Sequence, residues 1–218
     1  MTSDTRGNTA TGINDRVVSE LVEEALRENV DFVLVAGDLA SGINVGPARF
    51  ETELRNWVAA MQPIRDAGIP VYVCRGNHEL GDMWYAEPNT PPNPLDNYAR
   101  RWLNVFGSDD SPQWQLPDNG PPEERYMSYA LAHKNALLVA LDQYAGVRHQ
   151  LVHSVNQAWL EAQLAARPRP HVFVFGHEPA FRALHAPIRH SWPVFPQEIG
   201  ITLCRLHTIN RSWTEWPL

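Results

Sequence analysis

Residues 69–79 read "IPVYVCRGNHE", a short apolar run followed by Gly76 and a group of polar side chains. The apolar part has the length and the β-branched content of a strand that is buried on both faces. Asn77, His78 and Glu79 then stand at the point where this strand would meet solvent. Such a group can turn the chain or hold a ligand. The ends of the other predicted strands help to distinguish these two roles.

Two further apolar runs end in the same way. "DFVLVAGD" (31–38) ends in Gly-Asp, and "HVFVFGHE" (171–178) is followed by Gly-His-Glu after its last phenylalanine. Ligands of α/β sheets bind beyond the carboxyl ends of the strands, and a glycine there lets the backbone turn sharply. If the strands are parallel neighbours, one rim collects four side chains: Asp38, Asn77, His78 and His177. Asp4, near the N-terminus, offers a further carboxylate.

These residue types predict a metal site. Carboxylate, amide and imidazole donors suit a divalent ion such as Mn, Fe, Zn or Mg, and a carboxylate that bridges two ions about 3.5–4 Å apart is usual in two-metal sites. The two cysteines, Cys74 and Cys204, are far apart and form no CxxC pair. A disulfide framework or a cysteine zinc site is therefore not expected.

Helical and strand patterns alternate along the chain, which is typical of an α/β protein with a mainly parallel sheet. Two loops, over residues 86–96 and 108–125, are expected to form lids or substrate walls. The predicted elements are helices over 14–30, 48–68 (with Pro63 able to end it early), 98–106 and 154–167 (with a Ser154–Gln157 capping box), strands over 31–36, 69–74 and 171–175, two strands within 126–143 joined at Lys134–Asn135, and loops over 86–96 and 108–125.

Length and composition predict one α/β domain over residues 1–218. Of the 218 residues 44% are hydrophobic, which is enough for a packed core. The formal net charge of -7 argues against a nucleic-acid or anionic-membrane partner. No apolar segment predicts a membrane span or a signal peptide, so the chain as written is expected to be cytoplasmic. The oligomeric state is left open.

Four motifs, in this order, resemble those of the calcineurin-like metallophosphoesterase family: "SDTRG" (3–7), "GDLASG" (37–42), "RGNHE" (75–79) and "FGHEPAF" (175–181). The resemblance runs from about Asp4 to about Phe181. It implies an α/β fold arranged as a four-layer α/β/β/α sandwich with a dinuclear metal site. The expected cofactor is one or two divalent ions per chain, Mn, Fe, Zn or Mg.

The resemblance also implies a role for each motif residue. Asp38 would bridge the two ions, with Asp4 on the first ion and Asn77 and His177 on the second. His78 would contact the phosphate or protonate the leaving oxygen, and Glu79 would orient His78. The residues by themselves leave other readings open: Asp38 as a turn residue, Asn77 as a turn former, His177 as a structural histidine, and Glu79 in a surface ion pair with Arg75.

Two motifs depart from the family pattern. The first motif of the family reads Asp-x-His, and Arg6 stands at the histidine position. Since a guanidinium cannot ligate a cation, Arg6 would hold a phosphate oxygen, replace part of a missing metal's charge, or lie in a solvated loop. No Gly-His-x-His follows Phe181, and few residues precede Asp4, so the sandwich is expected to be incomplete at both ends. Residues 184–218 are interpreted as an atypical tail, truncated or frameshifted.

Without the histidines of the first and last family motifs, the first ion keeps Asp4 and the shared Asp38. The second ion keeps three protein ligands, Asp38, Asn77 and His177. Three ligands plus water can still hold a catalytic ion. His185 and His190 are candidate substitute ligands.

The predicted function is a metal-dependent phosphoric ester hydrolase, a phosphomonoesterase or phosphodiesterase that uses a metal-bound hydroxide on a small phosphate ester. The alternative is a catalytically impaired or truncated relative that binds metal or phosphate. A zinc-protease motif H-E-x-x-H is excluded, because Asp82 and Phe181 stand where its second histidine is required. Neither a G-x-S-x-G elbow nor a P-loop is present.

Overall fold

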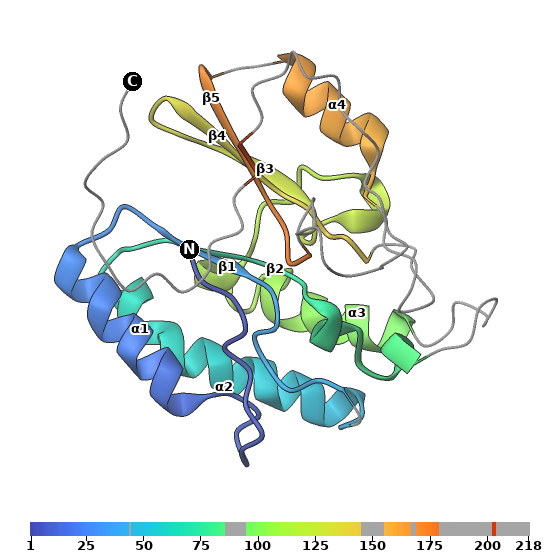
Figure 1. The fold of residues 1–218 in the computed structure, drawn as a ribbon. Helices are drawn as coiled ribbons and strands as arrows, with labels where there is room; N and C mark the ends of the chain where they lie inside the picture. Colours follow the sequence, from blue (N-terminus) through green and yellow to red (C-terminus); the bar gives the residue numbers. More distant parts are fainter. Residues whose placement is uncertain (44, 86–94, 145–154, 167–168, 179–201, 204–218) are drawn as a thin grey trace, which may run out of the picture.

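The computed structural model describes residues 1–43, 45–85, 95–144, 155–166, 169–178 and 202–203. Within these residues the strands form two sheets, and helices lie on the outer side of each (Figure 1). The predicted mixed α/β class is confirmed. The strands are β1 (Val33–Ala36), β2 (Val71–Cys74), β3 (Tyr129–His133), β4 (Ala136–Ala140), β5 (His171–Phe175) and β6 (Thr202–Leu203).

The first sheet pairs β1 with β2 in parallel, from Val33 opposite Val71 to Ala36 opposite Cys74. The N-terminal residues run beside β1 in the same direction: Thr2 N–H donates to the Leu34 carbonyl at 2.9 Å, and Ala36 N–H donates to the Thr2 carbonyl at 2.8 Å. The chain that leads into Asp4 is thus aligned with β1, and Asp4 lies at the carboxyl end of this sheet.

The second sheet has the order β3-β4-β5-β6. β3 and β4 are antiparallel and joined at Lys134 and Asn135, as predicted. Lys134 has a φ of 50° in this turn. β5 pairs in parallel with β4 and with β6. β5 is therefore not a neighbour of β1 and β2 in one sheet, and the condition on which the predicted convergence of strand ends rested is not met.

The helices α1 (Asp15–Glu28), α2 (Pro47–Asp66) and α3 (Leu95–Phe106) lie on the side of the first sheet, and α4 (Gln157–Ala166) lies on the side of the second (Figure 1). α1 and α2 confirm the predicted helices, and α2 runs through Pro63 to Asp66, so this proline does not end it early. α4 begins at Gln157, and Asn156 Oδ1 accepts from the Trp159 N–H at 3.1 Å. Asn156 therefore caps this helix, whereas Ser154 of the expected capping box lies outside the described residues. Shorter 3₁₀ segments lie at Asn77–Tyr85, Pro112–Trp114 and Pro122–Glu124.

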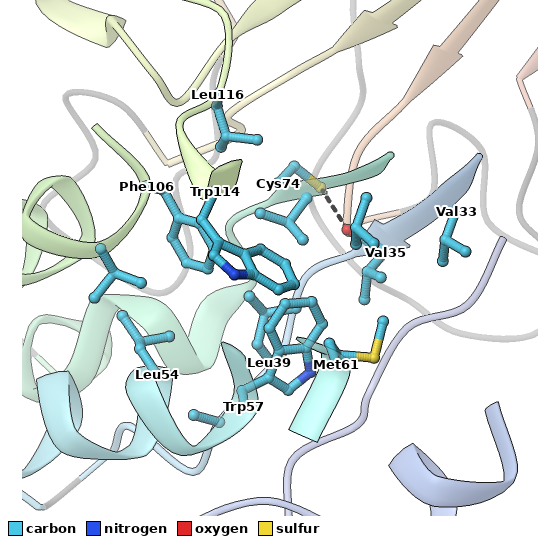
Figure 2. Close-up of a cluster of buried hydrophobic side chains, with 14 of the residues drawn as sticks. Val33, Val35, Leu39, Leu54, Trp57, Met61, Cys74, Phe106, Trp114 and Leu116 are labelled. Atoms are coloured by element: carbon cyan, nitrogen blue, oxygen red, sulfur yellow. Dashed lines mark hydrogen bonds between the residues drawn. The ribbon is translucent and has the colours of Figure 1, made fainter. Parts of the chain in front are cut away.

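The larger hydrophobic cluster lies between the first sheet and its helices, with Trp57, Met61 and Phe106 fully buried (Figure 2). Trp114 belongs to the same cluster, and its Nε1 donates to Gln62 Oε1 at 2.9 Å. This part of the 108–125 loop is packed on the core and is not a substrate wall. Residues 86–94 of the other loop lie outside the described residues.

A smaller cluster fills the space between the second sheet and α4, where Val139 and Val174 meet Leu160 and Leu164. The two sheets also touch each other directly, because the Tyr129 hydroxyl donates to the Val73 carbonyl at 2.7 Å. Among the described helices, none combines the length and the apolar character required to cross a membrane.

Candidate metal centre

Two glycines bring the ends of β1 and β2 together. Gly37 and Asp38 have φ values of 76° and 55°, and the Asp38 side chain is buried. A Cβ on Gly37 would lie 2.6 Å from the Gly76 nitrogen, and a Cβ on Gly76 would lie 2.2 Å from Asp38 Oδ1. A side chain at either position would push the two strand ends apart or displace the carboxylate. Asp38 itself adopts a left-handed conformation that is uncommon outside glycine and is concentrated at functional sites.

Three predicted ligand atoms meet at this point. His177 Nε2 lies 3.0 Å from Asn77 Oδ1 and 3.4 Å from Asp38 Oδ1. An ion with ligand bonds of about 2.0–2.2 Å holds neighbouring ligand atoms roughly 3.0–3.5 Å apart, so both separations fit a shared ion. Asp4 joins this group, since ligand atoms of Asp4, Asp38 and His177 all lie within 4.8 Å of one another. The structure thus brings together the four residues that the sequence singled out as ligands, although β5 belongs to the other sheet.

His177 is oriented for ligation by its other ring nitrogen. Nδ1 lies 2.8 Å from the Ala36 carbonyl oxygen, which can only accept, so Nδ1 carries the proton and donates. When Nε2 is unprotonated, its lone pair faces two oxygens that also accept, and a cation between them would satisfy all three. A backbone carbonyl behind the imidazole is the usual support of a metal-binding histidine. Burial lowers the pKa of His177, but the charge of Asp38 and the Ala36 carbonyl outweigh this, and the pKa is raised overall.

Gln143 holds the turn that carries His177. The Glu178 N–H donates to Gln143 Oε1 at 2.6 Å, and Gln143 Nε2 donates to the Glu178 carbonyl at 2.9 Å. Gln143 is buried and follows β4. The sequence interpretation missed this residue, and the one signal for it was a polar side chain just after an apolar run.

His78 lies beside the ligands and is also oriented by backbone. Its Nδ1 contacts the Ser41 carbonyl oxygen, and its Nε2 lies 3.9 Å from Asp38 Oδ2. The side chain is 16% exposed, so the ring reaches the surface of the site.

Glu79 does not take the expected position behind His78. In the described hydrogen bonds its carboxylate accepts from backbone N–H groups: Gly76 at 2.6 Å, Asp38 at 2.9 Å and Leu39 at 2.9 Å. The reading of Glu79 as a surface ion-pair partner of Arg75 is wrong, because Glu79 is fully buried and Arg75 pairs with Asp142. Burial, helped by the Asp38 charge, raises the pKa of Glu79 to about 7, while the N–H groups oppose this shift. Glu79 fastens the loop after β1 to the turn after β2.

Arg6 lies directly on the central carboxylate. Its Nε donates to Asp38 Oδ2 at 3.0 Å, and its side chain is 42% exposed. Its backbone N–H donates to the Asp38 carbonyl at 3.0 Å, so the main chain at Arg6 is also held against this residue. His185, His190 and residues 184–218 of the expected tail, apart from 202–203, lie outside the described residues.

Comparisons with known proteins identify the family of this chain. The family model of the calcineurin-like phosphoesterases matches residues 3–200. The uncharacterized metallophosphoesterase YhaO of Bacillus subtilis (strain 168) is 38% identical over 68 residues, a match that covers 31% of this chain and 16% of that protein. The crystal structure of a dimetal phosphatase from Danio rerio has a similar fold, with a TM-score of 0.52 and 17% identity over 83% of this chain and 69% of that chain. Because the family match extends over most of its length, the chain belongs to the calcineurin-like phosphoesterase family.

Proposed function

We propose that the protein is a metal-dependent phosphoric ester hydrolase. The observation that carries the proposal is that Asn77 Oδ1 and Asp38 Oδ1 lie 3.0 and 3.4 Å from His177 Nε2, at the ends of strands from two sheets. Family membership supports the same reaction class. The proposal includes a single domain over 1–218, a four-layer α/β/β/α arrangement and a small phosphate ester as substrate.

The donor set suits Mn, Fe, Zn or Mg, since it combines carboxylate and amide oxygens with one imidazole. A divalent ion held there would lower the pKa of water and offset the charge of phosphoryl oxygens. Asp38 and His177 would hold the ion from the two sheets, and the more exposed Asp4 would add a second carboxylate.

In this proposal His78 acts on the leaving oxygen. Its Nδ1 is tied to the Ser41 carbonyl, which leaves Nε2 directed toward the side of Asp38 Oδ2. As an imidazolium, His78 donates the Nε2 proton to the departing alkoxide or phenoxide, the usual work of a general acid. Arg6 lies on the same carboxylate oxygen and offers donors for a phosphate oxygen.

The test is hydrolysis of p-nitrophenyl phosphate and of its bis-ester by the full chain with added Mn²⁺. His177→Ala removes a ligand and is expected to lower turnover by about 100-fold or more, since even outer residues of metal sites cost about 10–100-fold. His171→Ala is the matched control, because His171 is exposed at the other end of β5. No turnover by a folded protein with any of the four metals overturns the proposal, as does a His177→Ala variant that equals the wild type.

One observation favours the alternative of an impaired relative. Arg6 already neutralises Asp38 Oδ2, and this contact lowers the charge available to a metal pair. Metal content separates the two functions: bound Mn²⁺ without hydrolysis of either ester supports the impaired relative, and bound Mn²⁺ with hydrolysis supports the enzyme.

A further inference from the structure

We infer that Arg6 takes the place of a second metal ion, so that this centre binds one divalent ion per chain. The inference rests on the proposed metal site and concerns how the site is charged. It starts from the contact between Arg6 Nε and Asp38 Oδ2 at 3.0 Å.

Asp38 directs its two oxygens to different partners. Oδ1 lies 3.4 Å from His177 Nε2 and accepts from the His78 N–H at 3.1 Å, whereas Oδ2 accepts from Arg6. A carboxylate can bridge two ions by giving one oxygen to each. Here the second oxygen already meets a guanidinium, which stays protonated under all conditions that proteins tolerate.

The position of Arg6 is fixed by its backbone as well as by its side chain. Its N–H donates to the Asp38 carbonyl at 3.0 Å, and Arg6 forms an isolated antiparallel bridge with Ile13. The neighbouring Thr5 carbonyl accepts from the Asn14 N–H at 2.8 Å. The guanidinium therefore starts from a main chain bonded on two sides, next to the buried carboxylate, and a divalent ion at Oδ2 would be placed against a fixed positive charge.

Among the described residues, the candidate metal ligands are divided unequally between the two sides of Asp38. Asn77 and His177 lie within ligand spacing on the Oδ1 side, and Asp4 has an oxygen within 4.8 Å of both Asp38 and His177. On the Oδ2 side stands Arg6, at the position where the first motif of the family has a histidine. A histidine could give an imidazole lone pair to an ion, whereas a guanidinium only donates hydrogen bonds. One ion on the Oδ1 side and one arginine on the Oδ2 side satisfy every one of these groups. Arg6 then supplies, from the chain itself, positive charge for a phosphate oxygen.

The experiment measures metal content and magnetic coupling with Mn²⁺ as the probe. Wild-type protein is expected to take up one Mn²⁺ per chain in calorimetric titration, with the electron paramagnetic resonance spectrum of an isolated ion. Arg6→His removes the charge and restores a donor, so it is expected to add a second Mn²⁺ per chain, exchange-coupled to the first. Arg16→His is the control, because the Arg16 side chain is 85% exposed on α1; it is expected to keep one ion.

Two Mn²⁺ per chain in the wild type, or a coupled spectrum, overturns the inference. An Arg6→His variant that still binds one ion overturns the role given to Arg6. Should that variant fail to fold, the wild-type stoichiometry and spectrum decide. One uncoupled ion without ester hydrolysis supports the inference and counts against the proposed enzyme, whereas a wild type that binds no Mn²⁺ overturns both.

Discussion

At the residue scale, the centre depends on two glycines as well as on the polar side chains around Asp38. Asp38 is 2% exposed, and its two oxygens face different partners, Arg6 and the His78 backbone. This orientation exists because Gly37 and Gly76 leave no side chain between the two strand ends. The glycines of the motifs are as necessary to the ligand geometry as the ligands.

Gly76→Ala is expected to weaken metal binding. The new Cβ would lie 2.2 Å from Asp38 Oδ1, so the carboxylate must move away from His177. We expect Mn²⁺ affinity to fall by about 10-fold or more, and unfolding free energy by about 1–3 kcal/mol. Isothermal titration with Mn²⁺ and urea unfolding measure the two effects.

Gly68→Ala provides the control for this substitution. Gly68 also has a positive φ, 78°, but a Cβ added there would meet no described atom within 4 Å beyond its chain neighbours. The change is expected to cost about 1 kcal/mol of backbone strain and to leave Mn²⁺ affinity unaltered. Wild-type affinity in the Gly76→Ala variant would contradict the account of Asp38.

The ligands could be predicted from the sequence, and their supports could not. Asp38, Asn77 and His177 each come directly after a glycine that lies at the end of an apolar run, and this local pattern can be recognised along the chain. Glu79 instead binds the N–H of Leu39, 40 residues away, and Gln143 binds the backbone of Glu178, 35 residues away. Backbone N–H groups are the same at every residue, so no sequence pattern marks which of them a buried side chain will meet.

At the element scale, Glu51 joins α2 to α3. Its carboxylate accepts from Arg55 on its own helix, at 2.8 Å, and from Arg101 and Asn104 on α3, at 2.8 and 3.0 Å. Burial raises the pKa of Glu51, but these donors outweigh it and lower the pKa to about 2. The contact therefore makes the packing of two helices sensitive to acid.

Glu51→Gln is expected to destabilise the protein by about 1–2 kcal/mol at neutral pH, a value reduced for partial solvent screening. Because the folded-state pKa is below the ordinary value of 4.5, the stabilisation is present above pH 4.5 and is lost as the pH falls toward 2. The difference between variant and wild type in urea unfolding should shrink over this range. Glu20→Gln, whose side chain is 60% exposed, is the control and should change the free energy of unfolding much less, because exposed ion pairs contribute little. A constant difference for Glu51→Gln would refute the assignment.

Helix positions were predictable because α1 and α2 repeat apolar residues with helical spacing, and Phe50, Leu54 and Trp57 are fully buried as expected. The sheet that β5 joins was not predictable, since a buried strand has the same apolar run in either sheet. The prediction for the part of the 108–125 loop around Trp114 was wrong for a related reason. Its Trp114 packs on α2, and a tryptophan in a polar loop does not show from the sequence whether it faces a ligand or the core.

At the scale of the whole molecule, one buried ion pair connects the two sheets next to the metal centre. Arg75 and Asp142 are 1% and 0% exposed; Arg75 Nε donates to Asp142 Oδ2 at 3.1 Å, and the Arg75 Nη2 group contacts the same oxygen. Each partner stands one residue before a part of the site, Arg75 before Gly76 and Asp142 before Gln143.

Asp142→Asn is expected to destabilise the protein by about 3–5 kcal/mol, because it leaves a buried guanidinium without a counter-charge. The double variant Arg75→Met/Asp142→Leu removes both charges and should recover a large part of this loss. Urea unfolding of the wild type, Arg75→Met, Asp142→Leu and the double variant, taken as a double-mutant cycle, measures the coupling. Additive losses, with the double variant worse than either single one, would show that the pair does not act as a unit.

In the proposed metal site an ion would also join the two sheets, since Asp38 and Asn77 come from one sheet and His177 from the other. An ion that binds the folded state and not the unfolded chain stabilises folding by about 2.7 kcal/mol at a concentration 100 times its dissociation constant. For a chain of this length the melting temperature should then rise by about 5–10 °C with Mn²⁺ and return to its original value with EDTA. His177→Ala should abolish this rise because it removes the ligand from the second sheet, and His171→Ala, at the far end of the same strand, should retain it. A full shift in the His177→Ala variant would mean that the stabilising ion binds elsewhere and that the two sheets are not joined through this centre.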